Sequence, residues 1–276
     1  MSDSSLPAID ELGRDVLHLP RWRVIFSLIA PFGLICLYMQ FAFSGWWMPA
    51  ILSVIALSFV TYGSVSHDLV HRSLGLPRWL NDLLLSSIEL SLFRSGRSYR
   101  LVHLNHHARY PDVENDPEAF AAHGNFWSAL RSGPFFFVRL WWWAFQNNPT
   151  HRKRLLIEAT VIVNCIVGSI ISALIGWTIV PAVYFLLVYV GTWIVPLITA
   201  YVPHNPKGVS RLSQTRRFRG WVVRLIAFDH LYHLEHHLYP AVPHQRWPEL
   251  ARRLDPYLDR VGVPSVRLGL RLKECS

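Results

Sequence analysis

Histidine is the residue whose number and spacing point to chemistry in this 276-residue sequence. Fourteen histidines occur, and nine of them fall into short patterns. One i, i+4 pair and two i, i+3, i+4 triplets would place imidazoles on one face of a helix, and a ninth histidine follows a proline. The nine are His67, His71, His103, His106, His107, His204, His233, His236 and His237.

Such a set suggests a site for more than one metal ion. Neutral imidazole is the commonest protein ligand of transition metals, and nine exceed the number that a single zinc ion needs. The sequence has no His-Glu-x-x-His motif of zinc proteases and no Glu-x-x-His motif of carboxylate-bridged di-iron bundles. A histidine-rich, carboxylate-poor set suits iron that handles dioxygen, while ligand type alone leaves other metals open.

Three acidic residues lie within or near the histidine patterns. Asp68 and Glu235 either accept hydrogen bonds from ligand imidazoles, and so fix their tautomers, or are simple charges at helix ends, and we favour the first role. Asp116 suits either that role or an N-cap for the turn before Pro117, and we favour the cap.

Five histidines lie outside the nine. His230, three residues before His233, is either a tenth ligand or a hydrogen-bonding neighbour of the ligands, and we favour the neighbour. The other four are isolated in sequence, and we expect them at the surface or at the membrane interface: His18, His123, His151 and His244.

Membrane helices are the elements expected to position these residues. Hydrophobic residues make up 51% of the chain and charged residues only 16%, whereas about a quarter of the residues are charged in ordinary soluble domains. A bilayer core about 30 Å thick needs about 20 apolar residues in a helix. Two hairpins with turns at 44–45 and near Gly176 would be formed by four uncharged stretches: 24–43, 46–66, 159–177 and 178–203.

The basic residues predict how this bundle lies in the membrane. Of the 27 Lys and Arg residues, 3 precede Val24, 11 lie within 67–154 and 13 follow Pro203. By the positive-inside rule, both termini and the central segment face the cytoplasm, so all nine histidines lie at the cytoplasmic end. We expect a multi-pass protein of a bacterial inner membrane whose basic face attracts anionic lipids. A nucleic-acid partner is not expected, because that role needs a water-exposed basic domain.

We therefore predict an all-α fold: a single-domain membrane bundle of four helices with interfacial helices and a histidine-rich di-metal cap. The segment 79–93 is expected to be interfacial or re-entrant, and the aromatic residues around Arg139 are expected at the interface. A short helix after Pro248 is expected to cover the site. Within 1–276, the predicted parts are a cytoplasmic N-terminal segment, a first hairpin, a cytoplasmic or interfacial segment, a second hairpin and a cytoplasmic cap: 1–23, 24–66, 67–154, 155–203 and 204–276.

The ordered patterns H-x-x-x-H, H-x-x-H-H and H-x-x-H-H, with an extra histidine between the last two, resemble the membrane fatty acid desaturase superfamily. This superfamily comprises acyl desaturases, lipid hydroxylases and carotenoid ring hydroxylases and ketolases. The resemblance extends from about His67 to Arg253. It implies two non-haem iron ions held by the nine histidines, dioxygen as co-substrate, and an external electron donor such as a ferredoxin-like protein. The sequence has neither a Gly-rich dinucleotide motif nor a cysteine set for an iron–sulfur cluster.

Local features favour the carotenoid branch of this superfamily. They are His-Leu-Asn-His-His-Ala at 103–108, Asn-Asp-Pro at 115–117 and Tyr-Val-Pro-His at 201–204, whereas the segment 233–240 resembles both branches. Asp68-Leu69-Val70 departs from carotenoid enzymes, which often carry smaller residues there. We predict oxidation of C–H bonds in a membrane-dissolved lipid, with carotenoid ring hydroxylation or ketolation ahead of fatty acyl desaturation. A metal transporter or sensor is a remote alternative, because the spans carry almost no ionisable residues.

Overall fold

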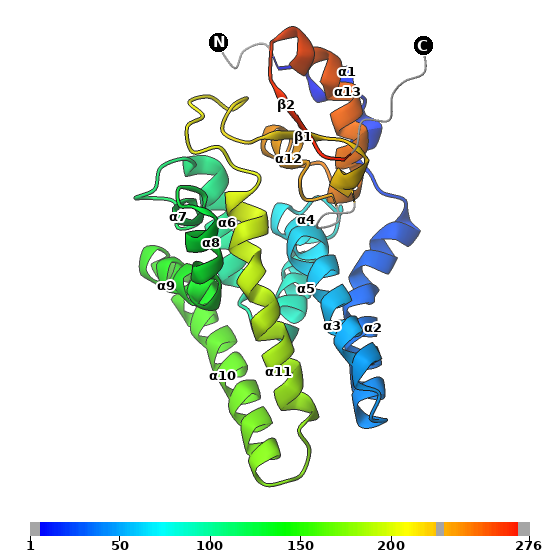
Figure 1. The fold of residues 1–276 in the computed structure, drawn as a ribbon, viewed down its shortest axis with the longest axis vertical. Helices are drawn as coiled ribbons and strands as arrows, with labels where there is room; N and C mark the ends of the chain where they lie inside the picture. Colours follow the sequence, from blue (N-terminus) through cyan, green and yellow to red (C-terminus); the bar gives the residue numbers. More distant parts are fainter. Residues whose placement is uncertain (1–5, 225–228, 270–276) are drawn as a thin grey trace.

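The computed structural model describes residues 6–224 and 229–269, and most of these residues are helical (Figure 1). The prediction of four apolar spans is confirmed, because four helices within these described residues have the length and composition to cross a membrane. Three of the four extend at least three residues beyond a predicted bound. Their bounds are Arg14–Phe43, Trp47–His71, Pro149–Leu174 and Val180–Tyr201.

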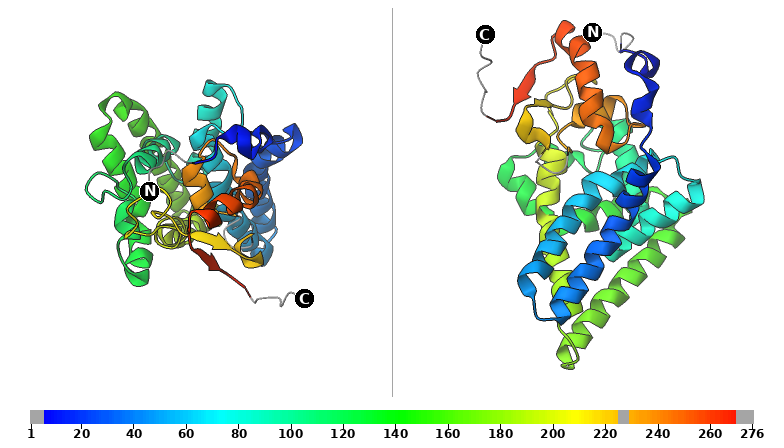
Figure 2. Two further views of the ribbon diagram at one scale, coloured as in Figure 1. Left: turned by 90° about the horizontal axis from the view of Figure 1, so that it is seen from above. Right: turned by 90° about the vertical axis from the view of Figure 1, so that its right-hand side faces the viewer.

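The first two spans lie side by side (Figures 1 and 2). Helix α2 (Arg21–Phe43) is followed after a tight turn by α3 (Trp47–Val60). Gly45 in that turn has a φ of +78°, a backbone conformation that favours glycine. The Tyr38 hydroxyl of α2 donates to the carbonyl of Val180 at 2.7 Å, which ties this pair to the fourth span.

The second span continues past the point where the sequence predicted its end. A π-helical turn (Thr61–Val65) follows α3, and Ser64 within it departs from helical geometry. Helix α4 (Ser66–His71) then completes the same long helix. His67 was predicted to lie just beyond the span, but it lies within it, on the last turns. A π-turn changes the direction in which later side chains point, and such turns are frequent at functional sites.

Helices that are too short to span lie between the two long pairs. They are α5 (Arg78–Ser91), α6 (Gly96–Arg109), α7 (Ala119–Ala122), α8 (Phe126–Ser132) and α9 (Phe136–Asn147).

Helix α6 is fastened at its N-terminus by a buried carboxylate of the third span. Glu158 accepts hydrogen bonds from the Ser95 hydroxyl at 2.5 Å and from the backbone N–H of Arg97 at 3.1 Å. At Gly96 an added Cβ would lie 2.9 Å from the carbonyl oxygen of Leu85, so glycine lets α6 pack closely on α5. These contacts place α6, which carries three of the nine histidines.

The last two spans form the other long pair (Figure 1). Helix α10 (Arg152–Leu174) is connected to α11 (Val180–Gly191) through a loop in which Gly176 has a φ of +74°. Beyond α11, a 3-10 turn (Thr192–Ile194) and a π-helical turn (Leu197–Tyr201) carry the chain to the histidine-bearing end.

The C-terminal region covers one end of the bundle, together with the first described helix (Figure 1). It contains α12 (His233–Leu238) and α13 (Trp247–Arg260), and α1 (Ile9–Leu12) packs on α13. A parallel pair of strands, β1 (Arg217–Arg219) and β2 (Ser265–Arg267), departs from the all-α prediction. The remaining 3-10 turns are Arg14–Leu17, Gly133–Phe135, Pro149–His151, Trp221–Arg224 and His244–Arg246.

Candidate metal centre

The rings of the nine patterned histidines meet at one end of the bundle. Eight of them come from α4, α6 and α12, and the ninth is His204, three residues after the end of the fourth span. Their candidate ligand nitrogens fall into two groups, and within each group these atoms lie within 4.8 Å of one another. The first group is His67, His71, His103, His107 and His236, and the second is His106, His204, His233 and His237.

Each histidine triplet is divided between the two groups. On α6, His103 and His107 belong to the first group and His106 to the second, whereas on α12 only His236 belongs to the first. The groups adjoin, because the rings of His107 and His237 have centroids 4.4 Å apart. Helical spacing placed each triplet on one face, but it could not show that the face spans two sites.

The second group presents lone pairs that face one another. His106 Nδ1 donates to Asp116 Oδ2 at 2.7 Å, and His204 Nδ1 donates to the Ala200 carbonyl at 2.8 Å. When both imidazoles are neutral, each carries one N–H, and both Nε2 atoms are left as acceptors. These two Nε2 atoms lie 2.9 Å apart. Burial, and then the nearby His106, hold the pKa of His204 well below its usual range, which keeps it neutral. A shared cation explains such an approach, so the donor set fits a metal ion.

The first group contains buried nitrogens that need a partner. Within the described part of the chain, no hydrogen bond reaches either nitrogen of His67, Nε2 of His71 or Nδ1 of His236. An unsatisfied buried polar atom costs about 1–3 kcal/mol. Burial and then the neighbouring histidines also lower the pKa of His107 and His236, so their lone pairs are available. This group too is chemically suited to a transition metal.

Asp116 performs both roles that the sequence allowed. Its Oδ2 holds the His106 ring, while its Oδ1 accepts the backbone N–H of Glu118 at 2.9 Å. The preference for a cap alone was therefore too narrow. Burial alone would lower the pKa of His106, but the Asp116 carboxylate outweighs that effect and raises it.

Sequence reasoning missed Glu118. Its Oε2 lies 3.5 Å from Nδ1 of His103 and 3.8 Å from Nδ1 of His106. Burial would raise the pKa of Glu118, but its contact with His103 lowers it overall. Its place two residues after Asp116 was the available signal.

Asp68 and Glu235 have partners other than those predicted. Asp68 binds His244, which is not one of the nine, through the His244 ring at 2.6 Å and the His244 backbone N–H at 2.8 Å. Glu235 Oε1 instead pairs with Arg219 at 2.5 Å. Burial raises the pKa of Glu235, an effect that Arg219 only partly offsets. Neither hydrogen-bond partner is one of the nine histidines, so the expectation that Asp68 and Glu235 orient ligand imidazoles was wrong.

The histidines outside the nine occupy different surroundings. His18 and His123 are exposed and His151 is half-buried, as predicted, but His244 is buried against Asp68 and corrects the expectation of a surface position. His230 is buried beside both groups and belongs to neither of them among the described residues.

Aromatic rings close the site on two sides. Trp247, fully buried at the start of α13, has its ring 5.3 Å from that of His67 and 4.9 Å from that of His236. On the other side, the Tyr110 ring lies 4.5 Å from that of His204. The helix expected after Pro248 thus begins at Trp247, one residue before that proline, and covers the first group, which limits the access of water.

Comparison with known proteins agrees with this geometry. Residues 44–268 match the family model described as fatty acid desaturase. The chain is 26% identical to an sn-1 oleoyl-lipid 12-desaturase of Picosynechococcus sp., over 85% of this chain and 77% of that protein. A protein of the same name from Anabaena variabilis is 24% identical, over 75% of this chain and 68% of that protein.

A third relative has a different activity in its name. The chain is 28% identical to a beta-carotene ketolase of Paracoccus sp., over 78% of this chain and 87% of that protein. The family model covers most of the chain, and desaturases and a ketolase are both oxidoreductases. This protein is therefore a membrane oxidoreductase and belongs to the fatty acid desaturase family.

Proposed function

We propose that this protein uses dioxygen to oxidise C–H bonds of a membrane-dissolved carotenoid, by hydroxylation or ketolation of a ring. The nine histidines would hold two iron ions, five at one and four at the other. The observation that supports this most strongly is the convergence of nine imidazoles, six of them buried and three half-buried, into two adjoining groups at one end of four apolar helices. Membership of an oxidoreductase family leaves the transporter or sensor alternative without support.

When bound, iron would supply dioxygen activation and oxidation of the substrate C–H bond. The chain itself supplies geometry. Asp116 and the Ala200 carbonyl hold His106 and His204 with their Nε2 lone pairs facing inward. Trp247 and Tyr110 exclude water from the two groups. Each hydroxylation needs two electrons from a separate carrier, because one oxygen atom enters the product and the other leaves as water.

We further propose the predicted topology: one domain over 1–276, with both termini and the histidines on the cytoplasmic side. The basic residues of that side support contact with anionic lipids and with an acidic, ferredoxin-like electron donor, which they would steer by charge.

Fatty acyl desaturation is the second candidate. Two of the three relatives described above are named acyl-lipid desaturases. The ketolase match extends over more of the relative's own length, and the sequence features at 103–108, 115–117 and 201–204 support the carotenoid branch.

Expression in bacteria that make β-carotene would test this proposal. We expect carotenoid products that carry additional oxygen, detected by mass spectrometry, and iron that co-purifies with the protein. His106→Ala and His236→Ala should abolish oxidation and lower bound iron while membrane insertion is retained. New double bonds in host acyl chains, with β-carotene unchanged, would instead establish the desaturase. Full activity of either variant would contradict the ligand assignment.

A further inference from the structure

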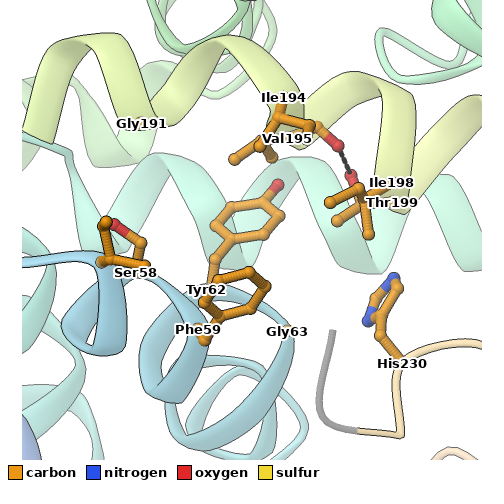
Figure 3. A pocket seen from close by; sticks show the side chains of 11 residues that line it. Ser58, Phe59, Tyr62, Gly63, Gly191, Ile194, Val195, Ile198, Thr199 and His230 are labelled. Atoms are coloured by element: carbon orange, nitrogen blue, oxygen red, sulfur yellow. Dashed lines mark hydrogen bonds between the residues drawn. The ribbon is translucent and has the colours of Figure 1, made fainter. Parts of the chain in front are cut away.

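A cavity of about 220 Å³ lies between the second and fourth spans, close to the histidine groups. Its walls are α3, the π-helical turn after it, the end of α11 and the turns that follow α11 (Figure 3). Most of its lining is apolar. Ile55, Phe59 and Ile194 line it and are also exposed on the outside of the bundle. The cavity therefore reaches the surface that lipid tails would contact.

One buried polar side chain, His230, lies at the end of this cavity opposite Ser58 (Figure 3). His230 is only 2% exposed; its ring has a backbone hydrogen bond with Gly63, and no hydrogen bond from any described residue reaches its Nε2. Its ring centroid is 6.2 Å from that of His67 in the first group and 4.9 Å from that of His233 in the second. A molecule that binds His230 from the cavity thus lies beside both groups.

The other polar groups of the lining are less available. The Ser58 and Thr199 hydroxyls donate to carbonyls of their own helical segments, those of Val54 and Val195. The Tyr62 hydroxyl points toward Val195 (Figure 3).

Gly63 makes room for the His230 ring. A Cβ added at Gly63 would lie 2.8 Å from Nδ1 of His230, which is closer than real Cβ contacts allow. The ring is therefore seated directly on the backbone of the π-helical turn. The other nitrogen, Nε2, is left without a partner among the described residues. A buried nitrogen without a partner costs about 1–3 kcal/mol, and a ligand hydroxyl would recover that cost.

We propose that the cavity receives the reacting end of the lipid substrate and that His230 hydrogen-bonds a hydroxyl carried by that end. This inference rests on the proposed function. A hydroxylated carotenoid ring has an oxygen beside its reactive C–H bonds, whereas the interior of an acyl chain has none. His230 would then favour ring substrates that have already been oxidised once.

The same contact would serve ketolation, which oxidises one carbon twice. In the first turnover, one atom of O₂ enters a C–H bond to give the alcohol, and the other becomes water with two donor electrons and two protons. A second, identical turnover at that carbon gives a geminal diol, which loses water to leave the ketone. A hydrogen bond from the alcohol to His230 would retain it between the two turnovers.

Replacing His230 tests the hydroxyl contact. We expect His230→Phe to raise KM for hydroxylated β-carotene about tenfold, equivalent to about 1.4 kcal/mol, and to lower the ketone-to-alcohol product ratio. KM for β-carotene itself and bound iron should stay within twofold of wild type. His230→Gln, which keeps a hydrogen-bonding group, should restore most of the preference. An equal effect on both substrates, or loss of iron from His230→Phe, would overturn the proposed contact.

Blocking the cavity tests its occupancy. Ile194→Trp should lower turnover at least tenfold at unchanged iron content, whereas Leu186→Trp, an exposed position of α11 outside the cavity, should not. Normal turnover by Ile194→Trp would reject the cavity as the substrate site. If the wild type desaturates only acyl chains, the carotenoid function and the hydroxyl contact both fail. The rate at which Ile194→Trp desaturates acyl chains, compared with Leu186→Trp, would then still decide whether the cavity holds the substrate.

Discussion

At the scale of single residues, the second histidine group depends on acceptors that are not themselves candidate ligands. Asp116 and the Ala200 carbonyl each take the Nδ1 proton of one histidine, so both rings turn Nε2 toward the site. Such outer contacts set the tautomer, the orientation and the basicity of a metal-binding imidazole. Asp116 is therefore as informative to mutate as the histidines.

We expect Asp116→Asn to lower iron affinity by about 10- to 100-fold, because an amide is a weaker acceptor for the His106 N–H. Iron per chain, measured by metal analysis across a range of free iron concentrations, would check this. Asp112→Asn is a matched control, since Asp112 lies in the same loop and, among the described residues, its carboxylate accepts hydrogen bonds from Glu114 and Asn115. Equal iron affinity in the two variants would show that Asp116 serves only as a cap.

At the scale of elements, the C-terminal region is fastened to the second span by one buried pair. Asp68 on α4 takes two hydrogen bonds from His244, 176 residues later in the chain. Trp247 follows three residues later and packs against His67 and His236. The pair therefore positions the start of α13 over the first group.

His244→Ala should destabilise the protein by about 3 kcal/mol, because it leaves the Asp68 carboxylate buried with one partner fewer. Thermal unfolding of the purified protein in detergent would measure the loss as a lower midpoint. Gln245→Ala, which removes a half-buried contact with Ser27, provides the neighbouring control and should have a much smaller effect. A midpoint as high as that of the wild type would show that the pair does not fasten the C-terminal region.

At the scale of the whole molecule, the nine histidines connect elements that are remote in sequence. They extend from His67 in the second span to His237 in the C-terminal region. A metal ion that binds the folded protein alone stabilises it by an amount set by its concentration relative to Kd. Metal loading is thus expected to support the arrangement of the entire histidine-bearing end.

Chelation should therefore lower the thermal midpoint of the purified protein. A free iron concentration of 100 times Kd corresponds to about 2.7 kcal/mol of stabilisation. Re-addition of ferrous iron should restore the midpoint, and the His106→Ala variant should respond much less to either treatment. Identical midpoints with and without the chelator would argue against metal linkage between these elements.

The orientation in the membrane can be tested in whole cells. Three single-cysteine variants, Ser44→Cys, Trp177→Cys and Lys207→Cys, would be made in a background where Cys36, Cys165 and Cys275 are serine. An impermeant maleimide should label positions 44 and 177 in intact cells and position 207 only after lysis, since basic residues are retained in the cytoplasm. Labelling of position 207 in intact cells would reverse the proposed topology.

Much of the architecture could be read from composition and spacing. Uncharged runs of about 20 residues indicated the four spans, and helical spacing indicated which histidines share a face, because both depend on local geometry. Helix ends were less accurate. Helix α10 begins at Arg152, whereas the predicted span begins at 159, so α10 includes the charged Glu158. Hydrogen bonds from Ser95 and Arg97 make the buried carboxylate of Glu158 tolerable.

The division of the imidazoles between two groups and the partners of the acids depended on packing between distant segments. No local pattern relates Asp68 to His244, or divides His106 from His103 and His107, because each depends on how whole helices turn and approach one another. The π-helical turn that seats His230 on Gly63 is likewise a product of those contacts. Residue types and intervals thus specified the chemistry and the helices, whereas the mutual orientation of the packed helices specified which side chains meet.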